Sequence, residues 1–307
     1  MKRKLRIPDQ WKERAFWLES GQAYLYLLPA FAILAVFTFY PFFSAFRLSL
    51  YKWSAIHPPG AYIGLTNYTK IFADRHFWNA VWNTFYYVAV SVPVTLFVAL
   101  LVANLLNKPL RMRAFARTSF FLAYITPLVA VAMVWSWMYD WRYGLLNYLL
   151  GFLGINLINW LMDPKFAMLA VIIMSVWRFV GYQAIILLAG LQNIDQMYYD
   201  AAKVDGASGF RVWWNVTIPL LTPQIFFVFI MSMIGSFKVF TEIYVLFSGQ
   251  PGPLKSAETL VYYILRVGRF EGNLLGRAAA ASVFLFGVIF LFTLIQLFVT
   301  QRKVHYQ

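Results

Sequence analysis

Long apolar stretches alternate with short polar connections along almost the whole chain. A helix needs about 20 apolar residues to cross the hydrocarbon core of a bilayer, and six stretches reach such a length. They cover residues 23–50, 84–106, 118–139, 166–190, 222–247 and 277–300. The pattern therefore predicts an all-α integral membrane protein with six transmembrane helices. Residues 23–300 form one transmembrane domain between an N-terminal segment, residues 1–22, and a tail, residues 301–307.

The connection between the fourth and fifth stretches, residues 191–221, has a pattern of its own. Apolar side chains recur at helical spacing from Ile194 to Ala201, which predicts a short amphipathic helix. Gly206 then ends this helix in a turn, and we expect a second apolar helix to end at Pro219. The residues alone are equally compatible with an interfacial helix–turn–helix hairpin and with a docking site for a partner.

Composition and charge support a membrane location. Hydrophobic residues make up 61% of the chain and charged residues 12%, whereas soluble domains carry about 25% charged residues. The net charge is +14, but no basic helix outside the apolar stretches is available for nucleic acid. The chain has no cysteine and only three scattered histidines, so we expect neither a metal site nor a thiol nucleophile.

The distribution of Lys and Arg predicts the orientation of the chain. These residues are more frequent on the side that holds both chain ends, as in residues 1–14 and 107–117. The positive-inside rule then places both termini in the cytoplasm. The basic start followed by an apolar run resembles a secretory signal, but the run is too long for one, so we interpret it as a retained first span.

Several polar residues lie inside predicted spans, where charges are costly unless they face protein or water. Residues four apart share a helix face, and three such pairs occur in the fourth and fifth spans. These candidate residues of a solute path are Arg178 and Tyr182, Ser232 and Ser236, and Lys238 and Glu242. A simple ion pair between Lys238 and Glu242 is the alternative interpretation of the third pair.

The connection after the fourth span also carries a recognisable motif. Asp200-Ala201-Ala202, then Gly206, then Val216-Thr217-Ile218-Pro219 resembles the EAA loop of bacterial ABC importer permeases. The version DAAKVDGAS is similar to that of the maltose and glycerol-3-phosphate group of carbohydrate permeases, although Asp200 stands where Glu is usual. The stretches that start at Gly64 and Gly272 resemble further parts of these permeases. The resemblance implies a role in ATPase coupling for Asp200, Ala201, Ala202, Asp205, Gly206, Ala207 and Pro219.

The resemblance implies a function and a set of partners. The chain would be a pore-forming permease subunit, in a bacterial plasma membrane, that imports a sugar, oligosaccharide or sugar-like solute. Its partners would be a second homologous permease subunit, usually in a heterodimer and alternatively in a homodimer, two cytoplasmic ABC ATPase subunits and an extracytoplasmic solute-binding protein. ATP and Mg would bind to the ATPases. We expect no catalytic site or cofactor on this chain, since the nearest match to a P-loop, at Gly249, lacks the second motif glycine.

The resemblance also bears on the solute path. In the maltose-permease relatives the corresponding parts of the fourth and fifth spans hold the sugar contacts, and Arg178, Tyr182, Ser232 and Ser236 fall near those places. Arg178 and Lys238 would also suit a carboxylated or phosphorylated sugar. An ion-coupled secondary transporter is the main alternative, but it needs acidic residues within its spans, and only Glu242 qualifies. A membrane scaffold would need none of these polar residues.

Overall fold

The computed structural model describes residues 14–53, 60–109, 111–272 and 274–301. This part of the chain is built from helices, with one isolated bridge between Tyr51 and Tyr62. The longer elements are α1 (Arg14–Leu34), α2 (Tyr40–Ser49), α4 (Arg75–Asn107), α5 (Arg113–Ile125), α6 (Leu128–Met138), α8 (Pro164–Gln192), α11 (Ile218–Ser236) and α14 (Leu275–Gln301). The shorter ones are α3 (Thr66–Ala73), α7 (Leu145–Gly151), α9 (Gln196–Val204), α10 (Gly209–Val212), α12 (Thr241–Leu246) and α13 (Leu260–Leu265), with π turns at Ala35–Phe39, Trp213–Thr217 and Arg266–Phe270 and a 3₁₀ turn at Pro253–Lys255.

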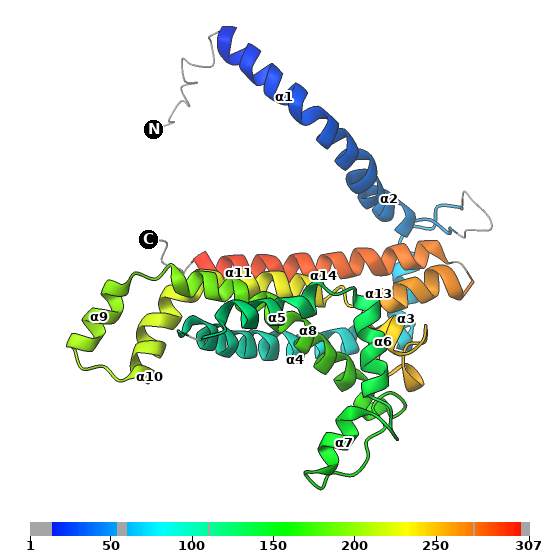
Figure 1. The fold of residues 1–307 in the computed structure, drawn as a ribbon. Helices are drawn as coiled ribbons and strands as arrows, with labels where there is room; N and C mark the ends of the chain where they lie inside the picture. The colour runs from blue at the N-terminus through cyan, green and yellow to red at the C-terminus, as the bar shows by residue number, and fades with distance from the viewer. Residues whose placement is uncertain (1–13, 54–59, 110, 273, 302–307) are drawn as a thin grey trace.

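Within the described residues, five helices are long and apolar enough to span a membrane. They overlap the first, second, fourth, fifth and sixth predicted spans, and they cover Ser20–Ser49, Arg75–Asn107, Pro164–Gln192, Gly209–Ser236 and Leu275–Phe298. The pair α5 and α6 would bring the number to six if it formed one span. Figure 1 shows α4, α8, α11 and α14 running side by side as a bundle.

The third predicted span, residues 118–139, is not one straight helix. α5 ends at Ile125, α6 starts at Leu128, and the two helices are bent by 96°. The cause is Pro127, because a proline donates no backbone hydrogen bond and pushes the residue before it out of the helical region. Thr126 accordingly has an extended ψ of 134°.

The fifth predicted span, residues 222–247, is also interrupted. α11 ends at Ser236 and α12 begins at Thr241. In the break, the Val239 carbonyl accepts a hydrogen bond of 2.8 Å from the Thr259 hydroxyl. Lys238 and Glu242 therefore do not share a helix face, and the prediction that they do was wrong.

The core of the bundle is the contact between α4 and α8. Both helices bury side chains along their length, among them Phe77, Tyr87 and Met174. α5 crosses α8 at Gly181, where a Cβ would lie 1.8 Å from the Phe120 carbonyl oxygen. The close approach of these two helices therefore depends on the absence of a side chain at this position.

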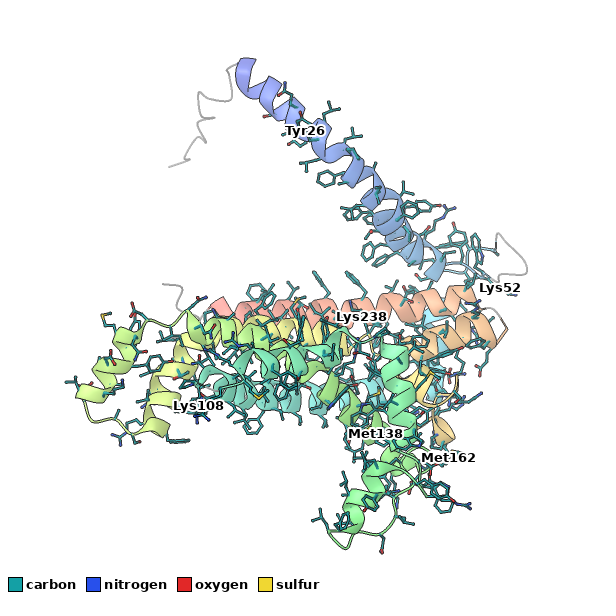
Figure 2. The ribbon with its side chains drawn as sticks, viewed as in Figure 1. Tyr26, Lys52, Lys108, Met138, Met162 and Lys238 are labelled. Atoms are coloured by element: carbon teal, nitrogen blue, oxygen red, sulfur yellow. The ribbon has the colours of Figure 1, made fainter. Side chains whose placement is uncertain are left out.

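The first long helix stands apart from the bundle. Ser20–Ser49 projects away from the other helices in Figure 1, and α2 packs against α14 at its far end. Figure 2 shows its side chains extending into open space, with Tyr26 84% exposed. Outside the contact of α2 with α14, this apolar surface has no partner within the described part of the chain.

The residues between α12 and α14 that fold back onto α4 are called here the α13 segment, residues 253–271. Asn79 and Asn83 donate side-chain hydrogen bonds of 3.0 Å to the Lys255 and Glu258 carbonyls. The buried Glu258 carboxylate also accepts a hydrogen bond of 2.5 Å from Arg266 Nε, and Arg266 pairs with Glu271 as well. The segment is thus held by buried polar groups and not by apolar packing alone.

Candidate functional site

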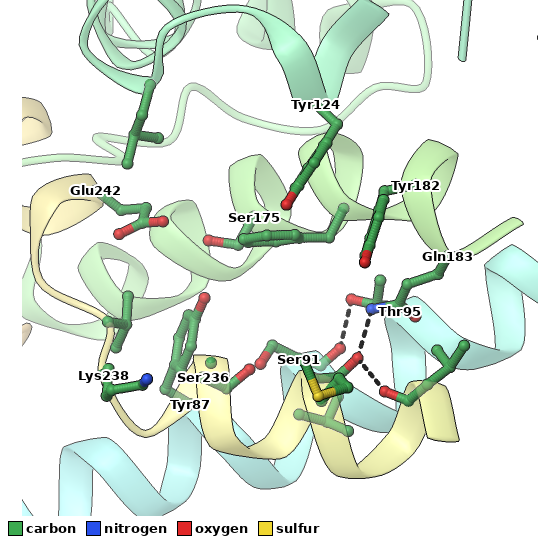
Figure 3. Close-up of a pocket in the computed structure, with 18 of the residues that line it drawn as sticks. Tyr87, Ser91, Thr95, Tyr124, Ser175, Tyr182, Gln183, Ser236, Lys238 and Glu242 are labelled. Carbon is green, nitrogen blue, oxygen red and sulfur yellow. Dashed lines mark hydrogen bonds between the residues drawn. The ribbon is translucent and has the colours of Figure 1, made fainter. Parts of the chain in front are cut away.

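A cavity of about 370 Å³ lies inside the bundle. Its walls come from α4, α5, α8 and α11, from the first residues of α6 and α12, and from the break between α11 and α12. Figure 3 shows the polar side chains that project into it. The volume lies at the lower end of the range of about 300–1,000 Å³ that small-molecule sites occupy.

The structure brings five of the six predicted solute-path residues to this cavity. They are Tyr182, Ser232, Ser236, Lys238 and Glu242. The sixth, Arg178, does not line the cavity but stacks on two aromatic rings that do. Its guanidinium lies 5.5 Å from the centre of the Tyr124 ring and 5.1 Å from that of Phe179, which are favourable distances for cation–π contacts.

Two tyrosines form an aromatic wall. Tyr124 of α5 and Tyr182 of α8 stack with their ring centres 4.4 Å apart and an angle of 16° between the planes. The Pro127 bend ends α5 just beyond Tyr124, so the bend positions the end of α5 beside α8. Apolar ring faces with polar edges are suited to ligands that combine flat apolar faces with hydroxyl groups.

Hydrogen-bonding groups are interspersed with apolar side chains over the rest of the wall. Gln183 Nε2 donates a hydrogen bond of 2.8 Å to Ser232 Oγ, and the Ser232 hydroxyl donates one of 2.6 Å to the Val228 carbonyl. Within the described structure, Gln183 Oε1 and the hydroxyls of Ser91 and Ser175 have no hydrogen-bond partner of good geometry. Ser91 and Ser175 also interact with the Tyr87 hydroxyl, so Gln183 Oε1 is the acceptor among the three with unused hydrogen-bonding capacity.

Several residues of the cavity wall were not predicted from the sequence. Tyr87, Ser91 and Thr95 line the cavity from α4, and they follow one another at intervals of four residues. A polar stripe at this spacing within an apolar span marks one helix face, so the signal was present in the sequence. Tyr124, Ser175 and Gln183 also line the cavity, but no comparable spacing marks them all.

Lys238 and Glu242 both face the cavity without pairing. The ion pairs within the described residues are those of Lys203 with Asp200 and of Arg266 with Glu258 and Glu271. Figure 3 shows Lys238 and Glu242 approaching the cavity from separate places along the broken segment. The simple ion pair considered from the sequence is therefore not formed.

The predicted coupling residues lie on and after α9, at one end of the bundle (Figure 1). Asp195 caps this helix by accepting a hydrogen bond of 2.9 Å from the Met197 amide. Asp200, Ala201, Asp205 and Gly206 are exposed, whereas Ala202 is buried and Ala207 half-buried. The Asp200 carboxylate accepts a hydrogen bond of 2.9 Å from Lys203 and another from Gln196. These two bonds hold the pKa of Asp200 below its usual value.

The turn after α9 has a left-handed residue at Gly206, with φ of +67°. Pro219 does not end the second helix, contrary to our prediction. α10 continues through the π turn Trp213–Thr217 into α11, so Gly209–Ser236 is one long helix. The wider π turn immediately before Pro219 leaves room for the proline ring, which clashes with a carbonyl in a regular helix.

Comparisons with known proteins agree with this architecture. Residues 70–305 match the family model described as binding-protein-dependent transport system inner membrane component. The trehalose/maltose transport system permease protein MalF of Thermococcus litoralis is 33% identical over 280 residues, which cover 91% of this chain and 93% of that protein. The lactose transport system permease protein LacF of Rhizobium radiobacter is 36% identical over 244 residues, which cover 78% and 81%.

A solved structure shows the same fold. A chain of a bacterial alginate ABC transporter, crystallised with a periplasmic protein that binds an alginate pentasaccharide, superimposes with a TM-score of 0.82. The identity is 23%, and the match covers 96% of this chain and 98% of that one. None of these comparisons supports an ion-coupled secondary transporter. Together they establish that the chain belongs to the family of binding-protein-dependent transport system inner membrane components, among the ABC permeases for sugars.

Proposed function

We propose that this chain is a pore-forming permease subunit that takes a sugar, oligosaccharide or sugar-like solute into the cell. The cavity between α4, α8 and α11 is the observation that carries this proposal. Its stacked pair Tyr124 and Tyr182 suits the apolar face of a sugar ring, and its serine, threonine and glutamine groups suit the ring hydroxyls. The solute passes unchanged, and ATP hydrolysis on separate subunits drives the transport cycle.

The segment from α9 to Gly206 is the proposed contact with the ATPases, which bind ATP and Mg²⁺. Met197 and Val204 are apolar residues on α9 with exposed fractions of 65% and 88%, and the exposed Ala201 lies between them at helical spacing. Asp200 adds a charged group beside this apolar face. A short capped helix of this kind can transmit a movement as a rigid body, which flexible backbone cannot.

The remaining partners follow from the same proposal. A second homologous permease subunit and lipid would surround the exposed helix Ser20–Ser49, and an extracytoplasmic solute-binding protein would deliver the solute. Both chain ends lie in the cytoplasm of a bacterium, on the side of α9. The excess of Lys and Arg on that side supports this orientation.

Crosslinking tests the proposed ATPase contact. The chain has no cysteine, so Ala201→Cys introduces a single reactive site on the exposed face of α9. In membranes that contain the whole complex, we expect this cysteine to crosslink to an ABC ATPase in at least one nucleotide state. Lys70→Cys, on α3 at the opposite end of the bundle in Figure 1, is the matched control and should not reach it.

The result that would contradict the proposal is equally specific. If the complex purified from native membranes contains no ABC ATPase, and Ala201→Cys forms no such crosslink with any nucleotide bound, the chain does not act as the permease of an ABC importer.

A further inference from the structure

Lys238 occupies an unusual position in the cavity wall. Its neighbours in the break after α11, Phe237 and Val239, are 1% and 5% exposed and pack into the core. Lys238 itself is exposed and lines the cavity. Because both neighbours are anchored, and because the Thr259 hydroxyl binds the Val239 carbonyl, the backbone holds the Lys238 side chain against the cavity.

The charges around the cavity do not cancel. Glu242 is the one carboxylate among the lining residues, and the guanidinium of Arg178 acts on it electrostatically. Neither residue takes part in an ion pair with Lys238 in the described structure. Two cationic side chains, Arg178 and Lys238, thus accompany a single carboxylate, which leaves one positive charge in excess, and Lys238 is the one of the two cations that lines the cavity.

The other side of the cavity is neutral. Figure 3 shows Gln183, Tyr182 and Thr95 on the side away from Lys238 and Glu242. Gln183 is 4% exposed, and its Oε1 is an unpartnered acceptor that can receive a hydrogen bond from a hydroxyl group. The cavity therefore combines a hydroxyl-binding side with a cationic side.

From this arrangement we infer that the solute is a sugar that carries one anionic group, and that Lys238 is the residue that selects for it. The neutral side receives the ring hydroxyls, and the Lys238 ammonium binds the anion. This inference rests on the proposed function, which leaves the charge of the solute open. A lysine is suited to this role because its ammonium group has three hydrogen-bond donors on a flexible side chain, which can adjust to a carboxylate, sulfonate or phosphate.

Binding of two matched disaccharides tests the inference. The probes are glucosyl-glucose and glucuronosyl-glucose, which differ by a carboxylate at one C6 position. Ligand-observed NMR on the nucleotide-free permease–ATPase complex measures their affinities without the solute-binding protein. We expect the carboxylated disaccharide to bind about tenfold more tightly, because hydrogen bonds to charged groups are stronger than those to neutral groups. This preference should weaken at high salt.

Variants assign the preference to one side chain. Lys238→Gln should remove the preference, because the affinity for glucuronosyl-glucose falls by about tenfold relative to that for glucosyl-glucose, whereas Lys238→Arg should keep most of the preference. Lys70→Gln removes an exposed charge on α3 and serves as the matched control. This variant should show the same preference for the carboxylated disaccharide as the unmodified complex.

Three outcomes would overturn the inference. The unmodified complex could bind both disaccharides equally, Lys238→Gln could retain the preference, or a complex that contains its ATPase could bind neither disaccharide. A complex without an ATPase would instead overturn the proposed function, so the two failures are distinguishable.

Discussion

At the scale of single residues, the backbone conformation alone restricts which residue can occupy position 206. Gly206 has a φ of +67°, and a Cβ would meet nothing within 4 Å. Valine rarely adopts this left-handed conformation, whereas asparagine does so more readily. Gly206→Val should therefore leave the subunit in the membrane but lower ATP-driven uptake sharply, and Gly206→Asn should retain most of the uptake. Uptake assays with quantification of the inserted subunit check both variants.

Gly181 provides the contrasting case for the same assay. A Cβ there would collide with the Phe120 carbonyl oxygen, so Gly181→Ala should lower the amount of folded subunit.

Normal uptake by a Gly206→Val permease would show that the turn is not needed to transmit movement. Loss of the Gly206→Val subunit from the membrane would show that the turn serves folding and not coupling.

The sequence indicated some residues of the cavity better than others. Arg178, Lys238 and Glu242 stood out because a charge within an apolar span is costly and rare. Ser91 and Thr95 did not stand out, because a small hydroxyl group costs little free energy in a membrane helix. It can donate a hydrogen bond to the backbone carbonyl four residues earlier. Thr95 makes such a bond of 2.6 Å to the Ser91 carbonyl.

At the scale of elements, the α13 segment depends on its buried ion pair. Glu258 is completely buried, and its partner Arg266 nearly so. Glu258→Gln leaves the buried Arg266 with only the half-exposed Glu271 as its partner, which should lower stability by about 3 kcal/mol. Glu258→Gln combined with Arg266→Met should recover part of this loss because no buried charge remains there without its partner. Thermal unfolding of the purified subunit in detergent measures both changes, and equal stability of the single and double variants would contradict this account.

The two broken spans show why helix positions were easier to predict than helix ends. The bend after α5 has a local cause, Pro127, which is visible in the sequence. In the break after Ser236, the Val239 carbonyl accepts a hydrogen bond from Thr259, which lies 20 residues further along the chain. Hydropathy cannot reveal such a contact, so the fifth span was predicted as continuous.

At the scale of the whole molecule, the orientation in the membrane can be tested directly. Lys203→Cys on α9 should react with a membrane-impermeant maleimide only after the cells are opened, because we place α9 in the cytoplasm. Lys70→Cys on α3 should react in intact cells. Both side chains are exposed, so access to water does not differ between them. The opposite pattern of labelling would reverse the proposed topology.

The polar residues of α4 connect two distant parts of the molecule. Asn79, Asn83, Tyr87, Ser91 and Thr95 recur every four residues, and the first two bind the α13 segment while the other three line the cavity. An α-helix turns by about 100° per residue, so each step of four drifts by roughly 40° around the axis. Over the whole series the drift is roughly 160°. The surface that binds the α13 segment and the surface that lines the cavity are thus centred roughly 100° apart around the helix axis, and any rotation of α4 about this axis would move the two surfaces in different directions.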